Sequence, residues 1–174
     1  MEALSMSSAA LKTEDFLTAR DERQARIDRA LQSPLPWAAT LSLSIPGADK
    51  CPPGALDLFQ WGVDQLGRQL ESIKVLLRDR DILGPWLLLT GDDRPIAVKR
   101  LGIALEEAHP TARLLDFDVY LPQGVALNRT TLGFAERSCL LCSCPARECV
   151  RLKRHRHEEI IRASHDLIAR FKPV

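Results

Sequence analysis

Two aspartates, Asp116 and Asp118, are separated by a single residue inside an apolar run from Leu114 to Leu121 that predicts a buried strand. Because successive side chains of a strand point to opposite sides, the two carboxylates share one face. Carboxylates this close in a poorly solvated place repel each other, and a divalent cation held by oxygen ligands relieves that repulsion. We therefore interpret the pair as a candidate Mg²⁺ site for phosphate chemistry. The plainer alternative is a strand end that dips into solvent.

A second group of residues has the spacing Cys139-x2-Cys142-x6-Cys149-x5-His155. These ligand types at short spacing are typical of a structural Zn²⁺ site, with the first pair on a tight turn and the last ligand entering a helix. The alternative is a set of small buried thiols in a reducing compartment. The five cysteines of the chain are an odd and crowded set, which favours metal binding or free thiols over a secreted disulfide framework.

The length and composition of the chain are typical of a compact globular protein. At 174 residues it is long enough for one core. We expect a single domain over residues 1–174, with residues 1–12 disordered and the Cys-rich residues 137–157 packed on the same domain. A net charge of +1 gives no sign of a general nucleic-acid or membrane partner. No apolar run reaches the roughly 18 residues of a membrane span, so we expect a cytoplasmic protein.

The spacing of apolar residues predicts the elements that position these side chains. Helices are predicted over Thr13–Leu31, Ala55–Leu77, Ile96–Glu107 and Arg151–Phe171, and strands over Ala38–Ile45, Pro85–Thr90 and Leu114–Leu121. This order predicts the α/β (α+β) class, with a small mixed sheet covered by helices and the Cys-rich segment appended.

The order of strand, Gly-containing turn, helix and strand with Asp-x-Asp is the plan of nucleotidyltransferase-like folds. In such folds the turn holds phosphates and the carboxylates hold the metal that bridges them. Gly91, Asp116 and Asp118 take those places here. Arg113, three residues before the first aspartate, is either a phosphate ligand or the structural partner of Asp116. The sequence leaves these two alternatives level.

The run from Glu106 to Val119, Glu-Glu-Ala-His-Pro-Thr-Ala-Arg-Leu-Leu-Asp-Phe-Asp-Val, resembles the signature of a known family. That family is holo-citrate lyase synthase, also called apo-citrate lyase phosphoribosyl-dephospho-CoA transferase. The arginine-rich segment Arg20–Arg26 and the Cys-rich segment from Arg137 to His155 resemble the same family in the same order. The resemblance covers the chain from about residue 18 to about residue 157. It departs at Ala112, where the family typically carries Gly.

The resemblance implies a phosphotransferase of the nucleotidyltransferase type. Its donor would be 2'-(5''-triphosphoribosyl)-3'-dephospho-CoA, and its acceptor a serine on the acyl carrier (gamma) subunit of apo citrate lyase. Pyrophosphate would leave. It further implies Mg²⁺ as the cofactor beside the candidate Zn²⁺, and neither nucleic acid nor membrane as a partner.

The resemblance also implies roles for single residues. The catalytic residues are Asp116, Asp118 and Arg113, with both aspartates on Mg²⁺, and the triphosphate ligands are Arg20, Arg23, Gly91 and Arg113. The acceptor of the serine proton is left open among either aspartate, Glu106 and Glu107. His109, before a proline, is expected to stop a helix or fill a structural role.

Two functions of other classes compete with the transferase. One is a zinc-knuckle module that binds nucleic acid or protein through the basic tail. The single Tyr and five Phe of the chain leave few platforms for base stacking, which argues against it. The other is a non-catalytic chaperone of the carrier protein, for which Ala112 is the only support. The intact pair Asp116 and Asp118 favours the enzyme.

Overall fold

A four-stranded sheet lies at the centre of the computed structural model, which describes residues 13–172. The strands are β1 (Ala38–Leu43), β2 (Ile73–Asp81), β3 (Gly84–Gly91) and β4 (Leu115–Tyr120), in the order β2-β3-β1-β4. The predicted α/β class, with a small sheet under helices, is confirmed. All three pairings are antiparallel, so the sheet is antiparallel rather than mixed in strand direction. The expected disorder of residues 1–12 lies outside the described residues.

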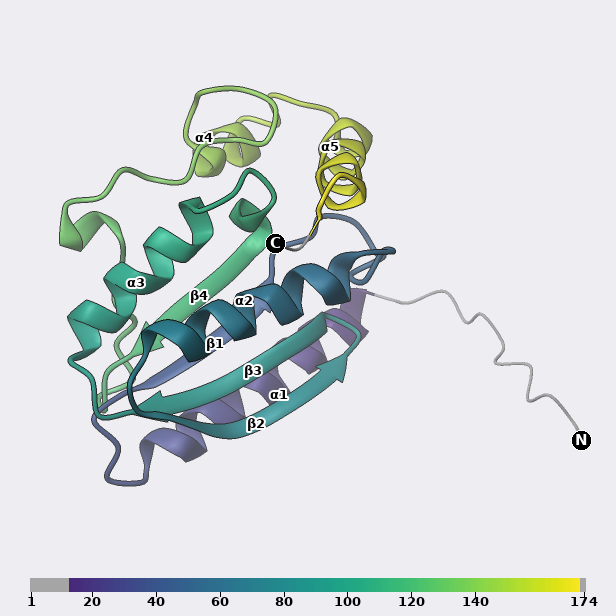
Figure 1. The fold of residues 1–174 in the computed structure, drawn as a ribbon. Helices are drawn as coiled ribbons and strands as arrows, with labels where there is room; N and C mark the ends of the chain where they lie inside the picture. The colour runs from purple at the N-terminus through teal and green to yellow at the C-terminus, as the bar shows by residue number, and fades with distance from the viewer. Residues whose placement is uncertain (1–12, 173–174) are drawn as a thin grey trace, which may run out of the picture.

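Helices cover both faces of this sheet (Figure 1). Helix α1 (Thr13–Leu31) lies on one face, and α2 (Ala55–Gln69) and α3 (Pro95–Glu107) lie on the other. The short helix α4 (Ala146–Arg151) and α5 (His157–Ala169) stand beyond one end of β4. Two 3₁₀ turns, η1 (Ala112–Leu114) and η2 (Thr130–Leu132), complete the elements of the described chain. None of the described helices is long and apolar enough to span a bilayer.

The predicted helix Ala55–Leu77 was wrong in its last part. Helix α2 ends at Gln69, because Leu70 turns to extended backbone while its N–H still donates to the Leu66 carbonyl. The following apolar residues belong to β2, which pairs with β3. A bulge between Val75 and Leu77 breaks the alternation of this edge strand, so its apolar residues imitate the spacing of a helix.

The predicted helix Arg151–Phe171 was also wrong at its start. Helix α4 ends at Arg151, and the chain makes a turn in which Lys153 has a φ of 46°. Helix α5 then begins at His157, where the Arg156 N–H donates to the Glu159 carboxylate at 3.1 Å. His155 therefore lies in the turn before the helix, where its side chain reaches Cys142.

Glycine at position 102 allows α3 to pack closely on β4. A Cβ there would overlap the Phe117 ring, whereas a Cβ at Gly67 of α2 would meet no atom within 4 Å. Lys99 and Glu106 share the packed side of α3 with Gly102, at three- and four-residue spacing, and both are buried. The close packing thus brings two charged side chains to β4.

We expect Gly102→Ala and Gly67→Ala to change stability in opposite directions. The first should lower the free energy of unfolding by about 1–3 kcal/mol through overpacking. The second should raise it by about 0.5–1 kcal/mol through helix propensity. Urea denaturation of both variants measures the difference, and equal effects would contradict the close packing of α3 on β4.

Candidate functional site

The two carboxylates of β4 lie on the face of the sheet opposite the main core. Leu115, Phe117 and Val119 are buried in the core, and the residues between them are half-buried. Asp116 pairs across the sheet with Ser42 of β1, and Asp118 pairs with Thr40. Each aspartate side chain is 41% exposed, so both oxygen groups remain open to a ligand. The predicted shared face is confirmed.

Each aspartate has a basic partner that the sequence did not predict. The Lys99 ammonium, only 7% exposed, donates to the Phe117 carbonyl at 2.6 Å and contacts Asp118 at 3.2 Å. Arg137 donates to Asp116 at 2.9 Å and to the Leu115 carbonyl at 3.1 Å. The two negative charges are therefore partly neutralised by the protein itself.

The electrostatic balance at Asp116 still opposes ionisation. Burial and the neighbouring Asp118 carboxylate raise the pKa of Asp116, while Arg137 and Lys99 oppose the rise. Burial is the largest cause of the raised pKa of Asp116, and repulsion from the Asp118 carboxylate adds to it. A further cation beside the two carboxylates would relieve that repulsion.

Glu106 holds the open edge of β4. One of its oxygens accepts from the Phe117 N–H at 2.9 Å and contacts Arg137 at 2.5 Å, and the other contacts Arg129 at 2.9 Å. Its side chain is 3% exposed. Burial raises the pKa of Glu106, and Arg137, the Phe117 N–H and Lys99 oppose that rise. Both oxygens are thus engaged in structure, whereas Glu107 is 59% exposed and contacts only Arg129, at 3.4 Å.

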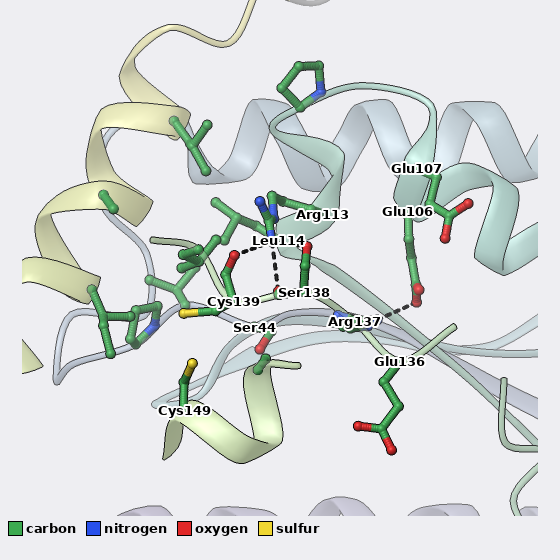
Figure 2. A pocket seen from close by; sticks show the side chains of 18 of the residues that line it. Ser44, Glu106, Glu107, Arg113, Leu114, Glu136, Arg137, Ser138, Cys139 and Cys149 are labelled. Atoms are coloured by element: carbon green, nitrogen blue, oxygen red, sulfur yellow. Dashed lines mark hydrogen bonds and ion pairs between the residues drawn. The ribbon is translucent and has the colours of Figure 1, made fainter. Parts of the chain in front are cut away.

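A large cavity opens beside this network, between the end of the sheet, α5 and the Cys-rich segment (Figure 2). Its volume is about 1130 Å³. Basic side chains line it at Lys50, Arg113, Arg129, Arg137 and Arg170, and acidic ones at Glu106, Glu107, Glu136 and Asp166. Apolar walls come from α5 and the sheet end, including Leu114, Ile160 and Leu167. Such a cavity suits a large ligand with both anionic and apolar parts.

Arg113 lies in η1, lines the cavity and points toward Ser138 and Cys139 (Figure 2). One of its terminal nitrogens donates to the Ser138 carbonyl at 2.8 Å and to the Cys139 carbonyl at 3.0 Å. The partner of Asp116 is Arg137. Of the two alternatives left by the sequence, the pairing of Arg113 with Asp116 is therefore wrong.

The arginines of α1 divide into two environments. Arg20 is exposed but lies near Lys50 of the cavity wall: burial lowers the pKa of Lys50, and the Arg20 charge lowers it further. Arg23 binds Asp81 through two nitrogens at 2.6 and 2.7 Å and stacks over Trp86 at 5.0 Å. These contacts give Arg23 a structural role in holding α1 on the sheet.

Gly91 and His109 also have structural explanations. A Cβ at Gly91 would overlap the Ser72 carbonyl, so close approach of β2 to β3 requires glycine there. Gly91 does not line the cavity, and neither do Asp116 and Asp118. His109 accepts from the Thr111 N–H at 3.1 Å and stacks edge-on with Phe171, as expected for a structural histidine after a helix.

The cysteine and histidine ligands gather as the spacing predicted. The three sulfurs of Cys139, Cys142 and Cys149 and a ring nitrogen of His155 lie within 4.8 Å of one another. Cys142 Sγ is 3.5 Å from Cys149 Sγ and 3.3 Å from His155 Nε2. Within residues 13–172 this is the one group of three or more such ligands so close together. The cluster can hold a metal such as Zn²⁺.

Local hydrogen bonds favour the thiolate form of one cluster ligand, Cys142, whereas burial raises the pKa of another, Cys149, to about 12. The Cys144 backbone and the His155 ring lower the pKa of Cys142 to about 6. The Leu141 N–H donates to the sulfur of Cys139 at 3.5 Å. Cys144 lies in the same turn, but its sulfur accepts from Arg154 at 3.1 Å instead of joining the cluster.

Comparison with known proteins assigns the chain to a family. The profile described as apo-citrate lyase phosphoribosyl-dephospho-CoA transferase matches residues 11–171. The chain belongs to this family. A Streptococcus pyogenes serotype M3 protein named "probable apo-citrate lyase phosphoribosyl-dephospho-CoA transferase" is 31% identical over 173 residues, 95% of this chain and 89% of that protein.

Two enterobacterial relatives with the same name, without "probable", agree. The Citrobacter koseri protein is 31% identical over 156 residues, which are 87% of this chain and 85% of the relative. The Escherichia coli O139:H28 protein is 31% identical over 170 residues, which are 93% of this chain and 91% of the relative. The family match covers the whole domain, so it includes the carboxylate strand and the Cys-rich segment together.

Ala112, the position at which the sequence departs from the signature that it resembles, causes no backbone strain. It is fully buried in η1, and Lys153 is the only described non-glycine residue with positive φ. The Ala112 N–H donates to the His109 carbonyl at 2.9 Å. The substitution therefore does not indicate a site that has lost its backbone geometry.

Proposed function

We propose that the chain transfers phosphoribosyl-dephospho-CoA from 2'-(5''-triphosphoribosyl)-3'-dephospho-CoA to a serine of the acyl carrier subunit of apo citrate lyase. The serine oxygen forms a bond to the α-phosphorus, the bond from that phosphorus to the bridging oxygen breaks, and pyrophosphate leaves. The observation that carries this proposal is the pair of half-exposed carboxylates on β4, in a chain of this family. Neither aspartate lines the cavity of mixed charge, but Arg137, which contacts Asp116 at 2.9 Å, does.

We propose that Asp116 and Asp118 hold Mg²⁺. Two carboxylates on one face are the ligand type that Mg²⁺ prefers, and no third acidic ligand is needed if substrate phosphates and water complete the shell. The raised pKa of Asp116 is consistent with room for another positive charge. Bound Mg²⁺ would supply charge neutralisation to the triphosphate.

The basic residues of this chain would orient the donor. Arg113 uses one terminal nitrogen on the Cys-rich segment, which leaves donors of its planar fork for a phosphate. Arg20 and Lys50 add positive charge at the margin of the cavity. Catalysis of this kind depends on positioning and on electrostatic stabilisation.

The serine proton needs an acceptor among the nearby carboxylates. Glu106 is the least suited, because both its oxygens are engaged by Phe117, Arg129 and Arg137. We propose that Asp116, Asp118 or Glu107 accepts it, since each keeps an exposed carboxylate.

We further propose that the cluster of Cys139, Cys142, Cys149 and His155 holds a structural Zn²⁺. The Cys-rich residues 137–157 and the sheet would then act as one transferase domain. The purified chain should contain stoichiometric zinc, Cys142→Ala should lose it, and Cys144→Ala should keep it. Elemental analysis measures this, and zinc retained in Cys142→Ala would contradict the assignment.

The competing functions have less support. A zinc-knuckle binding module accounts for the tail alone, whereas the family match extends over residues 11–171. A non-catalytic chaperone has no further support once Ala112 fits its site without strain. The transferase proposal accounts for the carboxylate strand, the cavity and the family match together.

Pyrophosphate release tests the proposed reaction. The chain is incubated with Mg²⁺, the triphosphoribosyl donor and the apo carrier subunit, and each component is omitted in turn. We expect release only when all are present. Release without the carrier subunit would instead indicate a hydrolase, and no release in the complete mixture would contradict the transfer.

A further inference from the structure

The segment between η2 and α5 has almost no core of its own. Among residues 133–156, only Cys139 and Cys149 are buried, with exposed fractions of 6% and 3%. Its one helix, α4, is six residues long. A segment with so little apolar burial does not hold a fixed conformation by itself, and a bound metal is a common substitute for the missing core.

This segment nevertheless supplies the side chain that organises β4. Arg137 contacts Asp116 at 2.9 Å, Glu106 at 2.5 Å and the Leu115 carbonyl at 3.1 Å. Figure 2 shows Arg137 directed at Glu106 across the floor of the cavity. The long side chain of Arg137 thus connects the carboxylates of Asp116 and Glu106 to the edge of β4. Holding such a side chain in one conformation costs entropy.

The backbone of Arg137 is fixed by the turn that carries the metal ligands. Its carbonyl accepts from the Ala146 N–H at 2.8 Å, and Ser138 forms a bridge with Pro145. The next residue, Cys139, donates its N–H to the Cys144 carbonyl at 2.8 Å. Arg137 therefore lies two residues before the cluster ligand Cys139. It belongs to the two paired chain segments, residues 137–139 and 144–146, that lie next to the metal ligands.

We propose that Zn²⁺ bound by Cys139, Cys142, Cys149 and His155 fixes Arg137 on the edge of β4, and that Arg137 is the positioning residue for Asp116 and Glu106. Without the metal, the part of the segment with Cys139 and Cys142 is no longer joined through an ion to the part with Cys149 and His155. Arg137 then leaves its acceptors, which are Asp116, Glu106 and the Leu115 carbonyl. Glu106 then keeps one of its two arginine partners, Arg129, and Asp116 loses Arg137. The link between the metal cluster and Arg137 is argued from the contacts alone, whereas its effect on transfer rests on the proposed function.

The Phe117 N–H is a specific reporter of this link. It points away from β1 and donates to the Glu106 carboxylate at 2.9 Å, so its protection depends on a side chain that Arg137 holds. The amide hydrogens shared by β2 and β3 belong to the opposite edge of the sheet, since the strand order is β2-β3-β1-β4. They serve as an internal control for the integrity of the fold.

Hydrogen exchange of single amides, followed by NMR, tests the proposal. The zinc-loaded chain is compared with the chain after chelation and with Cys142→Ala and its matched control Cys144→Ala. We expect exchange at Phe117 to quicken by roughly tenfold or more on zinc loss, while the β2 and β3 amides keep their protection. Cys144→Ala should behave like the unchanged chain, and added Zn²⁺ should restore the chelated one.

Variants of Arg137 separate the positioning role from the metal. Arg137→Ala should quicken exchange at Phe117 although zinc stays bound, and Arg137→Lys should recover part of the protection. If exchange at Phe117 is the same with and without zinc while the metal does leave, the proposal is wrong. It is also wrong if Arg137→Ala leaves that exchange unchanged.

The transfer assay distinguishes this inference from the proposed function. Removal of zinc and the Arg137→Ala substitution should each lower kcat by roughly 10–100-fold, with a smaller effect on KM for the donor. If the unchanged chain shows no transfer but zinc still protects Phe117, the positioning link holds and the function falls. If transfer is unaffected by Arg137→Ala, Arg137 does not position the reacting groups.

Discussion

Asp118→Asn is expected to lower kcat for transfer by about 10²–10³-fold while the protein stays folded. Removal of one group that stabilises transition-state charge has an effect of this order in other enzymes. Asp118 is 41% exposed, and within residues 13–172 its ion-pair partner is Lys99 at 3.2 Å. Asparagine has the same shape but provides no charge for a metal ion.

The matched control for this variant is Asp64→Asn. Asp64 is exposed on α2, where its carboxylate accepts only from Gln60, at 2.7 Å. Steady-state rates of both variants are measured over a range of Mg²⁺ concentrations, with far-ultraviolet circular dichroism to verify folding. Activity of Asp118→Asn within a few-fold of the unchanged chain would contradict the assignment of the carboxylates to the metal.

Glu106→Gln should have the largest effect on stability. Glu106 is 3% exposed and neutralises two arginines that are themselves largely covered, Arg129 at 16% and Arg137 at 32% exposure. Removal of one member of a buried ion pair leaves an uncompensated charge and costs about 3–5 kcal/mol. Because water still reaches Arg137, we expect a loss in the lower part of that range, about 3 kcal/mol.

The neighbouring residue provides the comparison for this prediction. Glu107→Gln removes the same charge from a side chain that is 59% exposed and contacts Arg129 at 3.4 Å. Its effect should stay below about 1 kcal/mol. Urea denaturation of both variants decides the matter, and similar losses for the two would show that the network at the β4 edge does not hold the strand.

Local patterns in the sequence were sufficient for the parts of the site that are close in the chain. Asp116 and Asp118 share a face because a strand alternates, and the structure confirms that face. The four metal ligands fall within 17 residues, from Cys139 to His155, and they gather as the spacing predicted. In both cases the spacing itself determines the arrangement.

The charged network was missed because its members are far apart in sequence. Lys99 reaches β4 from α3, 19 residues before Asp118, and Arg137 reaches Asp116 from 21 residues after it. Their spacing to the carboxylates has no period that a helix or strand would show. The one available signal was Lys99 on the same side of its helix as Gly102 and Glu106, where a lysine is expected only if it is paired.

Gly91 was proposed from the fold plan and Arg23 from the family resemblance, and both have structural contacts that explain their residue types. Gly91 is required by the close approach of Ser72, and Arg23 holds α1 against Asp81 and Trp86. Neither lines the cavity, but Asp116 and Asp118 do not line it either, so it is these contacts that give the two residues a structural role. An arginine on a helix or a glycine after a strand has many structural uses, so its type alone does not distinguish a ligand from a support.

The intact mass of the apo acyl carrier subunit is the most direct measurement. The subunit is weighed after incubation with the zinc-loaded chain, Mg²⁺ and the triphosphoribosyl donor, beside the same mixture with Asp118→Asn. We predict that its mass increases by one phosphoribosyl-dephospho-CoA unit, on the serine acceptor, with only a trace of product in the variant mixture. An unchanged mass with folded, zinc-loaded protein would contradict the proposed transfer.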